Sequence, residues 1–311
     1  MTGSKKEFRS SLLLLVTAVI WGVAFVAQRV AMDYIGPFTF NGVRFFLGAA
    51  ALTPVIYFFE KKKTSIDSTK NEEHKNKLKT TFLYGGICGL ILFAAASMQQ
   101  IGVDITMSAG RAAFITGLYI VLTPIFGIAL KKKTAPFIWY GAVISCAGLY
   151  YLSGSATGNP DINGINAGDG LLLAGAVFWA LHILWIDRCG EKIYPLRFAV
   201  IQFMVCSVLS LITAFIFEDV KMRSILAGYS PILYSALLSV GVAYTFQIIG
   251  QRNVGPAKSA IIFSTEALFA AVSGAIMLSE RMEMRGYLGC LLIFIGIICS
   301  QLRIKLPFYQ K

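Results

Sequence analysis

The stretch SSLLLLVTAVIWGVAFVAQRVA, residues 10–31, decides the fold, because it is almost entirely apolar and Arg29 is its only charged residue. A helix of roughly 20 such residues crosses a hydrocarbon core about 30 Å thick. Lys5, Lys6 and Arg9 precede the stretch as they would precede a signal peptide, but the apolar run is longer than the hydrophobic part of a signal peptide. We therefore expect a membrane-spanning helix that is retained in the protein.

Nine more runs of similar composition follow along the chain. They are residues 38–59, 80–102, 108–130, 135–153, 169–187, 196–217, 229–250, 258–279 and 286–303. Of the 311 residues, 56% are hydrophobic and 14% are charged, with a mean hydropathy of +0.68; soluble domains are about 45–50% apolar and about 25% charged. These values exclude a disordered chain, a disulfide-stapled secreted domain and an ordinary soluble enzyme. We predict an all-α integral membrane protein with ten transmembrane helices.

The net charge of +12 is typical of a nucleic-acid-binding protein, but its distribution indicates membrane orientation instead. With a cytoplasmic N-terminus, 21 of the 28 Lys and Arg residues fall in inner loops or at inner helix ends. The others are Arg29, Arg44, Arg111, Lys221, Arg223, Arg281 and Arg285. We expect a multi-pass protein of the cell (plasma) membrane with both termini cytoplasmic, and no nucleic-acid partner.

Self-comparison of the sequence predicts an internal repeat. At an offset of 158 residues Trp21 aligns with Trp179, and beyond the charged loop an offset of 148 aligns Gln99 with Gln247. We assign a first repeat to residues 10–153, an external linker to 154–168 and a second repeat to 169–303. Because each repeat holds five spans, an odd number, the two copies must lie antiparallel in the membrane. Inverted repeats of this kind recur in secondary transporters, which bind substrate near the midplane.

Three segments in each half form a recognisable pattern. They are Trp21-Gly22-Val23-Ala24-Phe25, Gly36-Pro37 and Asn41-Gly42-Val43-Arg44-Phe45, then Glu266-Ala267-Leu268-Phe269-Ala270-Ala271, Leu278-Ser279-Glu280-Arg281 and Gly286-Tyr287-Leu288-Gly289. The pattern resembles the EamA domain of the drug/metabolite transporter superfamily and covers nearly the whole chain. The resemblance implies ten helices as two EamA repeats, a central site built from spans 1, 3, 4, 6, 8 and 9, and export or exchange of small metabolites.

Glu266 and His182 lie well inside predicted spans, where an ionisable group costs about 2.5–3.5 kcal/mol to insert. Glu266 lies eight residues into the ninth span. It is a candidate for binding a substrate amine or a coupling proton; alternatively it is a packing carboxylate bonded to neighbouring hydroxyls. His182, which replaces Ala24 in the second copy, is a second proton-coupling and substrate-binding candidate. Its alternative is a neutral imidazole bonded to a backbone carbonyl.

Other polar and aromatic residues of the spans complete the predicted substrate site. Trp21, Gln28 and Trp179 lie on the paired helical stripes of spans 1 and 6, with packing as the alternative role of the two tryptophans. Tyr244 and Gln247 share a face of span 8. As repeat partners, Gln99 and Gln247 are expected at opposite membrane faces, as gates or helix-end caps.

Two arginines lie within about a turn of the outer ends of spans 2 and 4. Arg44 is expected to snorkel to the outer interface. Arg111 either does the same or clamps a carboxylate or phosphate of the substrate, because guanidinium groups bind both bidentately.

The leading hypothesis is a secondary transporter of a small amphipathic, amino-acid-like metabolite, working in efflux or exchange by alternating access and coupled to protons. A nucleotide sugar or sugar phosphate would demand clustered Lys and Arg, which the span interiors lack. A channel is the first alternative, and a receptor or an integral-membrane enzyme is less well supported. We expect no catalytic residues, cofactor or metal, because His74 and His182 are the only histidines and no Cys pair has metal-binding spacing. Substrate identity and oligomeric state are left open.

Overall fold

The computed structural model describes residues 2–61, 71–132, 134–156, 166–277 and 284–301, and within these ranges all regular structure is helical. Eight helical segments in them are long and apolar enough to cross a membrane. They are Lys5–Ala31, Pro37–Phe58, Glu72–Thr106, Ala109–Ala129, Ala167–Lys192, Pro195–Phe217, Tyr229–Val254 and Pro256–Met277. Two further apolar helices are α6 (Pro136–Ala156) and α14 (Met284–Gln301). Most of the predicted linker, residues 157–165, lies outside the described residues.

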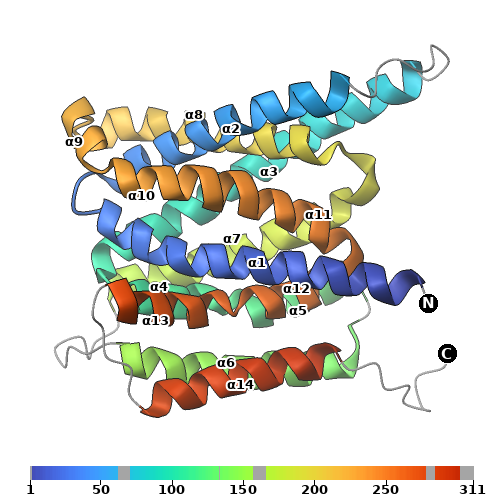
Figure 1. Ribbon diagram of the computed structural model, residues 1–311, viewed down its shortest axis with the longest axis vertical. Coiled ribbons are helices and arrows are strands. Elements are labelled where there is room, and N and C mark those ends of the chain that lie inside the picture. The colour runs from blue at the N-terminus through green and yellow to red at the C-terminus, as the bar shows by residue number, and fades with distance from the viewer. Residues whose placement is uncertain (1, 62–70, 133, 157–165, 278–283, 302–311) are drawn as a thin grey trace.

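The helices run side by side in layers (Figure 1). One side of the bundle holds α2 (Pro37–Lys61), α3 (Asn71–Thr106) and α8 (Pro195–Phe217), and the other holds α6 and α14. Between them lie α1 (Thr2–Ala31), α7 (Ala167–Cys189) and the interrupted helices described below. The beginning of α1 and the end of α14 lie at the same edge of the bundle (Figure 1).

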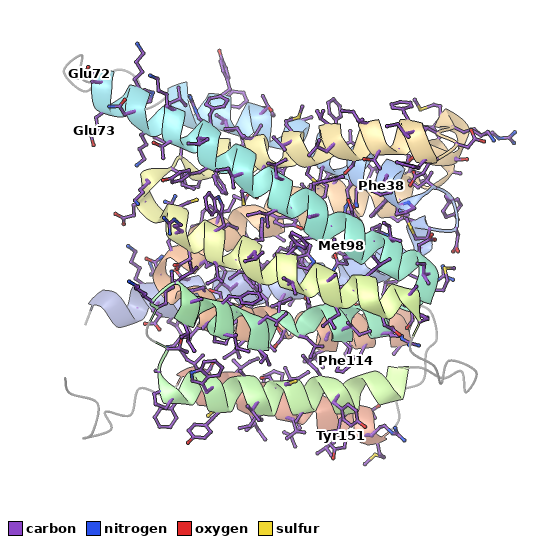
Figure 2. The ribbon with its side chains drawn as sticks, turned by 180° about the vertical axis from the view of Figure 1, so that it is seen from behind. Phe38, Glu72, Glu73, Met98, Phe114 and Tyr151 are labelled. Carbon is purple, nitrogen blue, oxygen red and sulfur yellow. The ribbon has the colours of Figure 1, made fainter. Side chains whose placement is uncertain are left out.

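Charged residues gather at the helix ends and apolar side chains on the outside of the bundle. Glu72 and Glu73 lie where α3 projects past its neighbours, whereas Tyr151 of α6 points outward from the flank (Figure 2). At the other edge the carboxylate of Glu218 accepts hydrogen bonds from the backbone amides of Phe38 (2.7 Å) and Thr39 (2.8 Å). These amides open α2 and have no partner within the helix, so Glu218 caps it.

Helices α6 and α14 approach so closely that only glycine fits between them. A Cβ atom added to Gly148 would lie 2.7 Å from the carbonyl oxygen of Gly289, and one added to Gly141 would lie 2.6 Å from that of Gly296. Small residues allow such backbone contact between helices in a membrane. A side chain at Gly141, Gly148 or Gly296 would therefore push α6 and α14 apart.

Two of the spans are broken in the middle, and a third is distorted. The breaks separate α4 (Ala109–Gly117) from α5 (Tyr119–Ala129) and α12 (Pro256–Phe263) from α13 (Glu266–Met277). At the second break the hydroxyls of Ser264 and Thr265 donate to the carbonyls three residues earlier, at 2.8 and 2.6 Å. Such side-chain bonds compete with the helical ladder. A π-helix, η3 (Ser235–Ala243), joins α10 (Tyr229–Tyr234) to α11 (Tyr244–Val254).

The short elements α9 (Met222–Ala227) and η2 (Gly190–Lys192) complete the described helices. Helix α9 leads from α8 into α10, and η2 links α7 to α8. Gly255 has φ +82°, a conformation that favours glycine, and it turns the chain from α11 directly into α12. The two broken helices and the π-helix meet in the middle of the bundle, where all three contribute to the lining of one cavity.

Candidate functional site

A buried cavity lies in the middle of the bundle, where the interrupted helices meet. Its volume is about 30 Å³, room for about two water molecules. It is lined from α1, α3, α4–α5, α7, η3–α11 and α12–α13, the six spans that the resemblance implied, and also from α2. The lining residues are Trp21, Phe25, Gln28, Arg44, Gln99, Thr116, Tyr119, Trp179, Ile183, Ser239, Tyr244, Gln247, Phe263 and Glu266.

Aromatic rings form one wall of the cavity. Trp21 lies with its ring centroid 5.0 Å from that of Tyr244 and 5.2 Å from that of Phe263, and Trp179 stacks on Tyr244 at 6.2 Å. The indole N–H of Trp21 donates to the carbonyl of Ser239, 3.4 Å away in the π-helix. A long hydrogen bond therefore connects Trp21 to the distorted backbone of η3.

Glu266 is the first residue of α13 and lies at the break in that helix. It is only 4% exposed, and its carboxylate accepts a 2.9 Å hydrogen bond from the hydroxyl of Tyr119. Tyr119 is the first residue of α5 and lies at the other break. The bond therefore links the two broken helices across the cavity. Ser259, which lies on the same helical side as Glu266 in the sequence, donates instead to the carbonyl of Gly255 in its own helix.

Three glutamine side chains face the cavity. Gln99 donates to the hydroxyl of Thr116 at 3.4 Å, whereas the side-chain oxygens of Gln28 and Gln247 are buried without a hydrogen-bond partner among the described residues. The expectation that Gln99 and Gln247 lie at opposite membrane faces is wrong, since both line one cavity. Each lies seven residues, or about 10 Å, inside its helix end, so both reach the middle of the bundle.

Arg44 is a lining residue that the sequence analysis assigned to the outer interface. It is 3% exposed, and its guanidinium carbon lies 4.8 Å from the ring centroid of Phe40 and 4.9 Å from that of Phe45. The prediction that Arg44 snorkels to the outer interface is therefore wrong. Arg44 begins the third turn of α2, about 10 Å from the start of that helix, and the two phenylalanines enclose its side chain.

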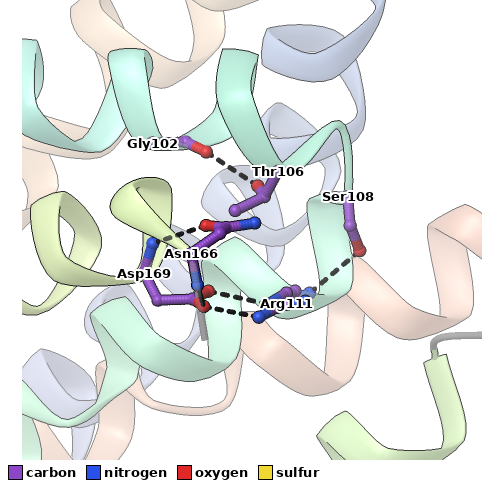
Figure 3. Close-up of polar contacts among 6 residues, drawn as sticks. All are labelled: Gly102, Thr106, Ser108, Arg111, Asn166 and Asp169. Atoms are coloured by element: carbon purple, nitrogen blue, oxygen red, sulfur yellow. Dashed lines mark hydrogen bonds and ion pairs between the residues drawn. The ribbon is translucent and has the colours of Figure 1, made fainter. Parts of the chain in front are cut away.

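His182 and Arg111, both predicted to bind substrate, do not line the cavity. His182 lies behind the aromatic wall, where its Nε2 is 3.0 Å from the side-chain oxygen of Gln202. Arg111 forms a bidentate ion pair with Asp169, with Nε at 2.7 Å from one carboxylate oxygen (Figure 3). Because Asp169 also forms a capping box with Asn166, the ion pair ties α4 to the beginning of α7.

Seven of the nine predicted site residues therefore lie together, and seven other lining residues were not among those predicted. The missed residues are Phe25, Arg44, Thr116, Tyr119, Ile183, Ser239 and Phe263. One signal was available for Tyr119, because at the 148-residue offset it adjoins Leu118, the repeat partner of Glu266. In the described part of the chain no three His, Cys, Asp or Glu residues are grouped as metal ligands.

Comparison with known proteins places this geometry in context. A model of the EamA-like transporter family matches residues 9–154 and again residues 166–301. A protein of Archaeoglobus fulgidus named as an uncharacterized transporter is 28% identical, over 96% of this chain and 88% of its own. YoaV of Bacillus subtilis, also named as an uncharacterized transporter, is 27% identical over 92% and 94%. YedA of Escherichia coli, named as an uncharacterized inner membrane transporter, is 22% identical over 90% and 86%.

The fold also occurs among solved structures. One crystal structure superimposes with a TM-score of 0.75, covering 94% of this chain and 96% of its own, at 15% sequence identity. At that identity the likeness shows a shared fold and carries no information about substrate.

Proposed function

This chain belongs to the EamA-like transporter family and is a multi-pass membrane transporter, and on that premise we propose that it moves a small amphipathic, amino-acid-like metabolite by alternating access. The observation that carries the proposal is the central cavity, which lies where two broken helices and a π-helix meet. Discontinuous helices at the midplane are typical of substrate sites in secondary transporters. Export or exchange is the proposed direction, in keeping with the family resemblance.

We also propose ten spans in two inverted repeats, residues 10–153 and 169–303, with both termini in the cytoplasm. Three observations support this arrangement. The family model matches the two halves separately, and the chain enters α1 and leaves α14 at the same edge of the bundle (Figure 1). The breaks in the fourth span of each half, at Leu118 and at Ser264–Thr265, correspond at the 148-residue offset to within two residues.

The cavity lining supports the proposed substrate class. Aromatic rings supply an apolar wall, the amides of Gln28 and Gln247 supply unused hydrogen-bonding groups, and Glu266 supplies a carboxylate. Lysine is absent from the lining, so the cavity lacks the cluster of cations that a phosphorylated substrate would need. A volume of about 30 Å³ is smaller than any such metabolite, so transport requires the two halves to move apart.

Glu266 is the group that we propose for proton coupling. A buried carboxylate can hold a proton, pair with a substrate amine or accept a hydrogen bond from a tyrosine hydroxyl. By alternating between these partners it can link substrate binding to a proton gradient. His182 is a weaker candidate, because it lies outside the cavity and is bonded to Gln202.

The test is transport by purified protein in proteoliposomes, with amino acids offered as counterflow substrates at two pH values. Saturable counterflow that depends on pH supports the proposal. A Glu266→Gln variant that folds but retains the wild-type pH dependence removes Glu266 from the coupling role. Single-channel currents in a planar bilayer would instead favour the alternative of a channel, and turnover of a substrate into a new product would favour the less supported alternative of an enzyme.

A further inference from the structure

We propose that Arg44 is the subsite that holds the carboxylate of the transported molecule, so that the cavity selects organic carboxylates of small size. This inference rests on the proposed transport function and adds a residue and a charge requirement to it.

The first step is that Arg44 is buried without a counter-charge. No hydrogen bond or ion pair joins its guanidinium to any described residue, and its Nε atom is fully enclosed and unpartnered. The titratable side chains that act on it electrostatically are the phenol of Tyr244 and the thiol of Cys206, which are neutral at pH 7. Burying a charge without a partner is costly, and buried charges in proteins are normally paired.

The second step is that Arg44 is held in place for a ligand. The rings of Phe40 and Phe45 lie within 5 Å of the guanidinium carbon, which restricts the side chain, and the residue lines the cavity. An anion entering the cavity therefore meets a preoriented donor group. A guanidinium binds a carboxylate through two parallel hydrogen bonds.

The cavity also holds a group of opposite charge. Glu266 lines the same cavity but forms no ion pair with Arg44, and its carboxylate is bonded to Tyr119. The two groups therefore do not neutralise each other. The unpartnered side-chain oxygens of Gln28 and Gln247 add acceptors. A simple carboxylic acid would bind only to Arg44. The amine of an α-amino acid would also donate to the glutamine oxygens, so the experiment below compares these two classes of substrate.

The experiment measures binding to purified protein in nanodiscs through the change in intrinsic tryptophan fluorescence, to which Trp21 and Trp179 in the cavity wall contribute. The probes are leucine, 4-methylpentanoate, which lacks the amine, and leucinol and 3-methylbutylamine, which lack the carboxylate. We expect the wild type to bind the two carboxylates about 30-fold or more tightly than the other two. Leucine tighter than 4-methylpentanoate identifies an amino-acid substrate, and equal affinity identifies a simple carboxylate.

Two variants and one control test the residue itself. Arg44→Gln should bind leucine and leucinol with affinities within about threefold of each other, while Arg44→Lys should retain part of the preference. Arg29→Gln, which removes an arginine paired with Asp33 outside the cavity, should bind as the wild type does. Should Arg44→Gln fail to fold, the wild-type preference and the loss measured for Arg44→Lys decide the matter.

The results distinguish a failure of the role of Arg44 from a failure of the proposed transport function. A wild type that binds the amine-only probes as tightly as the carboxylates, or an Arg44→Gln variant that keeps the carboxylate preference, overturns the role of Arg44 and leaves the transport function standing. If neither these probes nor any of the twenty amino acids binds or drives counterflow, the proposed function fails and the role of Arg44 fails with it.

Discussion

Gly22 of α1 packs against the first turn of α13, so replacing it with alanine should displace the helix that carries Glu266. An added Cβ would lie 2.4 Å from the Cβ of Phe269, 2.7 Å from the carbonyl oxygen of Glu266 and 2.9 Å from the amide of Ala270. Because real Cβ contacts stay above 3.0 Å, α13 must retreat by at least about 0.6 Å at the closest point. A shift of this size directed along the 2.9 Å bond from Tyr119 to Glu266 would lengthen it to about 3.5 Å, beyond the usual hydrogen-bond range.

A matched control separates the loss of unfolding free energy caused by the clash from the change in helix propensity. Overpacking a close contact costs roughly 1–3 kcal/mol, but alanine also favours a helix over glycine by about 1 kcal/mol. Gly86 of α3 has no atom within 4 Å of an added Cβ, so Gly86→Ala receives the helix-propensity gain alone. The difference in unfolding free energy between the two variants therefore isolates the clash, and Gly22→Ala should be less stable than Gly86→Ala by roughly 1–3 kcal/mol.

Thermal unfolding in detergent measures the stability difference, and counterflow in proteoliposomes measures the consequence for transport. Gly22→Ala should melt several degrees below Gly86→Ala, and its transport rate should fall while that of Gly86→Ala stays at the wild-type level. Equal melting temperatures, together with wild-type transport by Gly22→Ala, would refute the close packing of α1 on α13 and its effect on the Tyr119–Glu266 bond.

Three other predictions follow from the contacts of single side chains. Tyr119→Phe removes the hydrogen-bond donor to Glu266 and should alter the pH profile of transport; a change in melting temperature alone would indicate a structural bond. Asp169→Asn should lower stability by roughly 1–3 kcal/mol in thermal unfolding, because it leaves Arg111 with a weakened partner, and no loss would show that the pair is solvated. Arg44→Met should raise the melting temperature of the ligand-free protein, since it removes a buried unpaired charge; a lower melting temperature would mark Arg44 as a structural residue.

The positions of the membrane helices could be predicted from the sequence, because apolar runs report what lies in lipid. Their ends could not. Helix α1 begins at Thr2 and α3 at Asn71, several residues before the predicted runs 10–31 and 80–102. The polar residues in between include lysines and glutamates, which are good helix formers. A helix therefore continues past the point where hydropathy ends, into the region outside the apolar core.

The lining residues of the cavity could be predicted only where the residue type is unusual for the middle of an apolar helix. Glu266 and the two central tryptophans stand out in an apolar helix, and all three line the cavity. Arg44 was missed because a residue near a helix end is expected to extend its side chain to the interface. In the folded protein the rings of Phe40 and Phe45 pack on its guanidinium and keep it inside. Tyr119 was missed because a tyrosine in a span is common and its hydroxyl gains meaning only from the partner helix.

The breaks in α4–α5 and α12–α13 carry no signal that hydropathy detects, and yet they organise the site. At the 148-residue offset Leu118 occupies the place of Glu266, and Tyr119 the place of Ala267. One break thus supplies a carboxylate and the other a hydroxyl, and a single buried hydrogen bond joins them. If the halves move as inverted copies, their contacts at the cavity must change during the cycle, and this bond is one of those contacts. Only one copy has the carboxylate, and if this contact differs between the two access states, protonation of Glu266 shifts the equilibrium between them, which is the condition for the proton coupling proposed above.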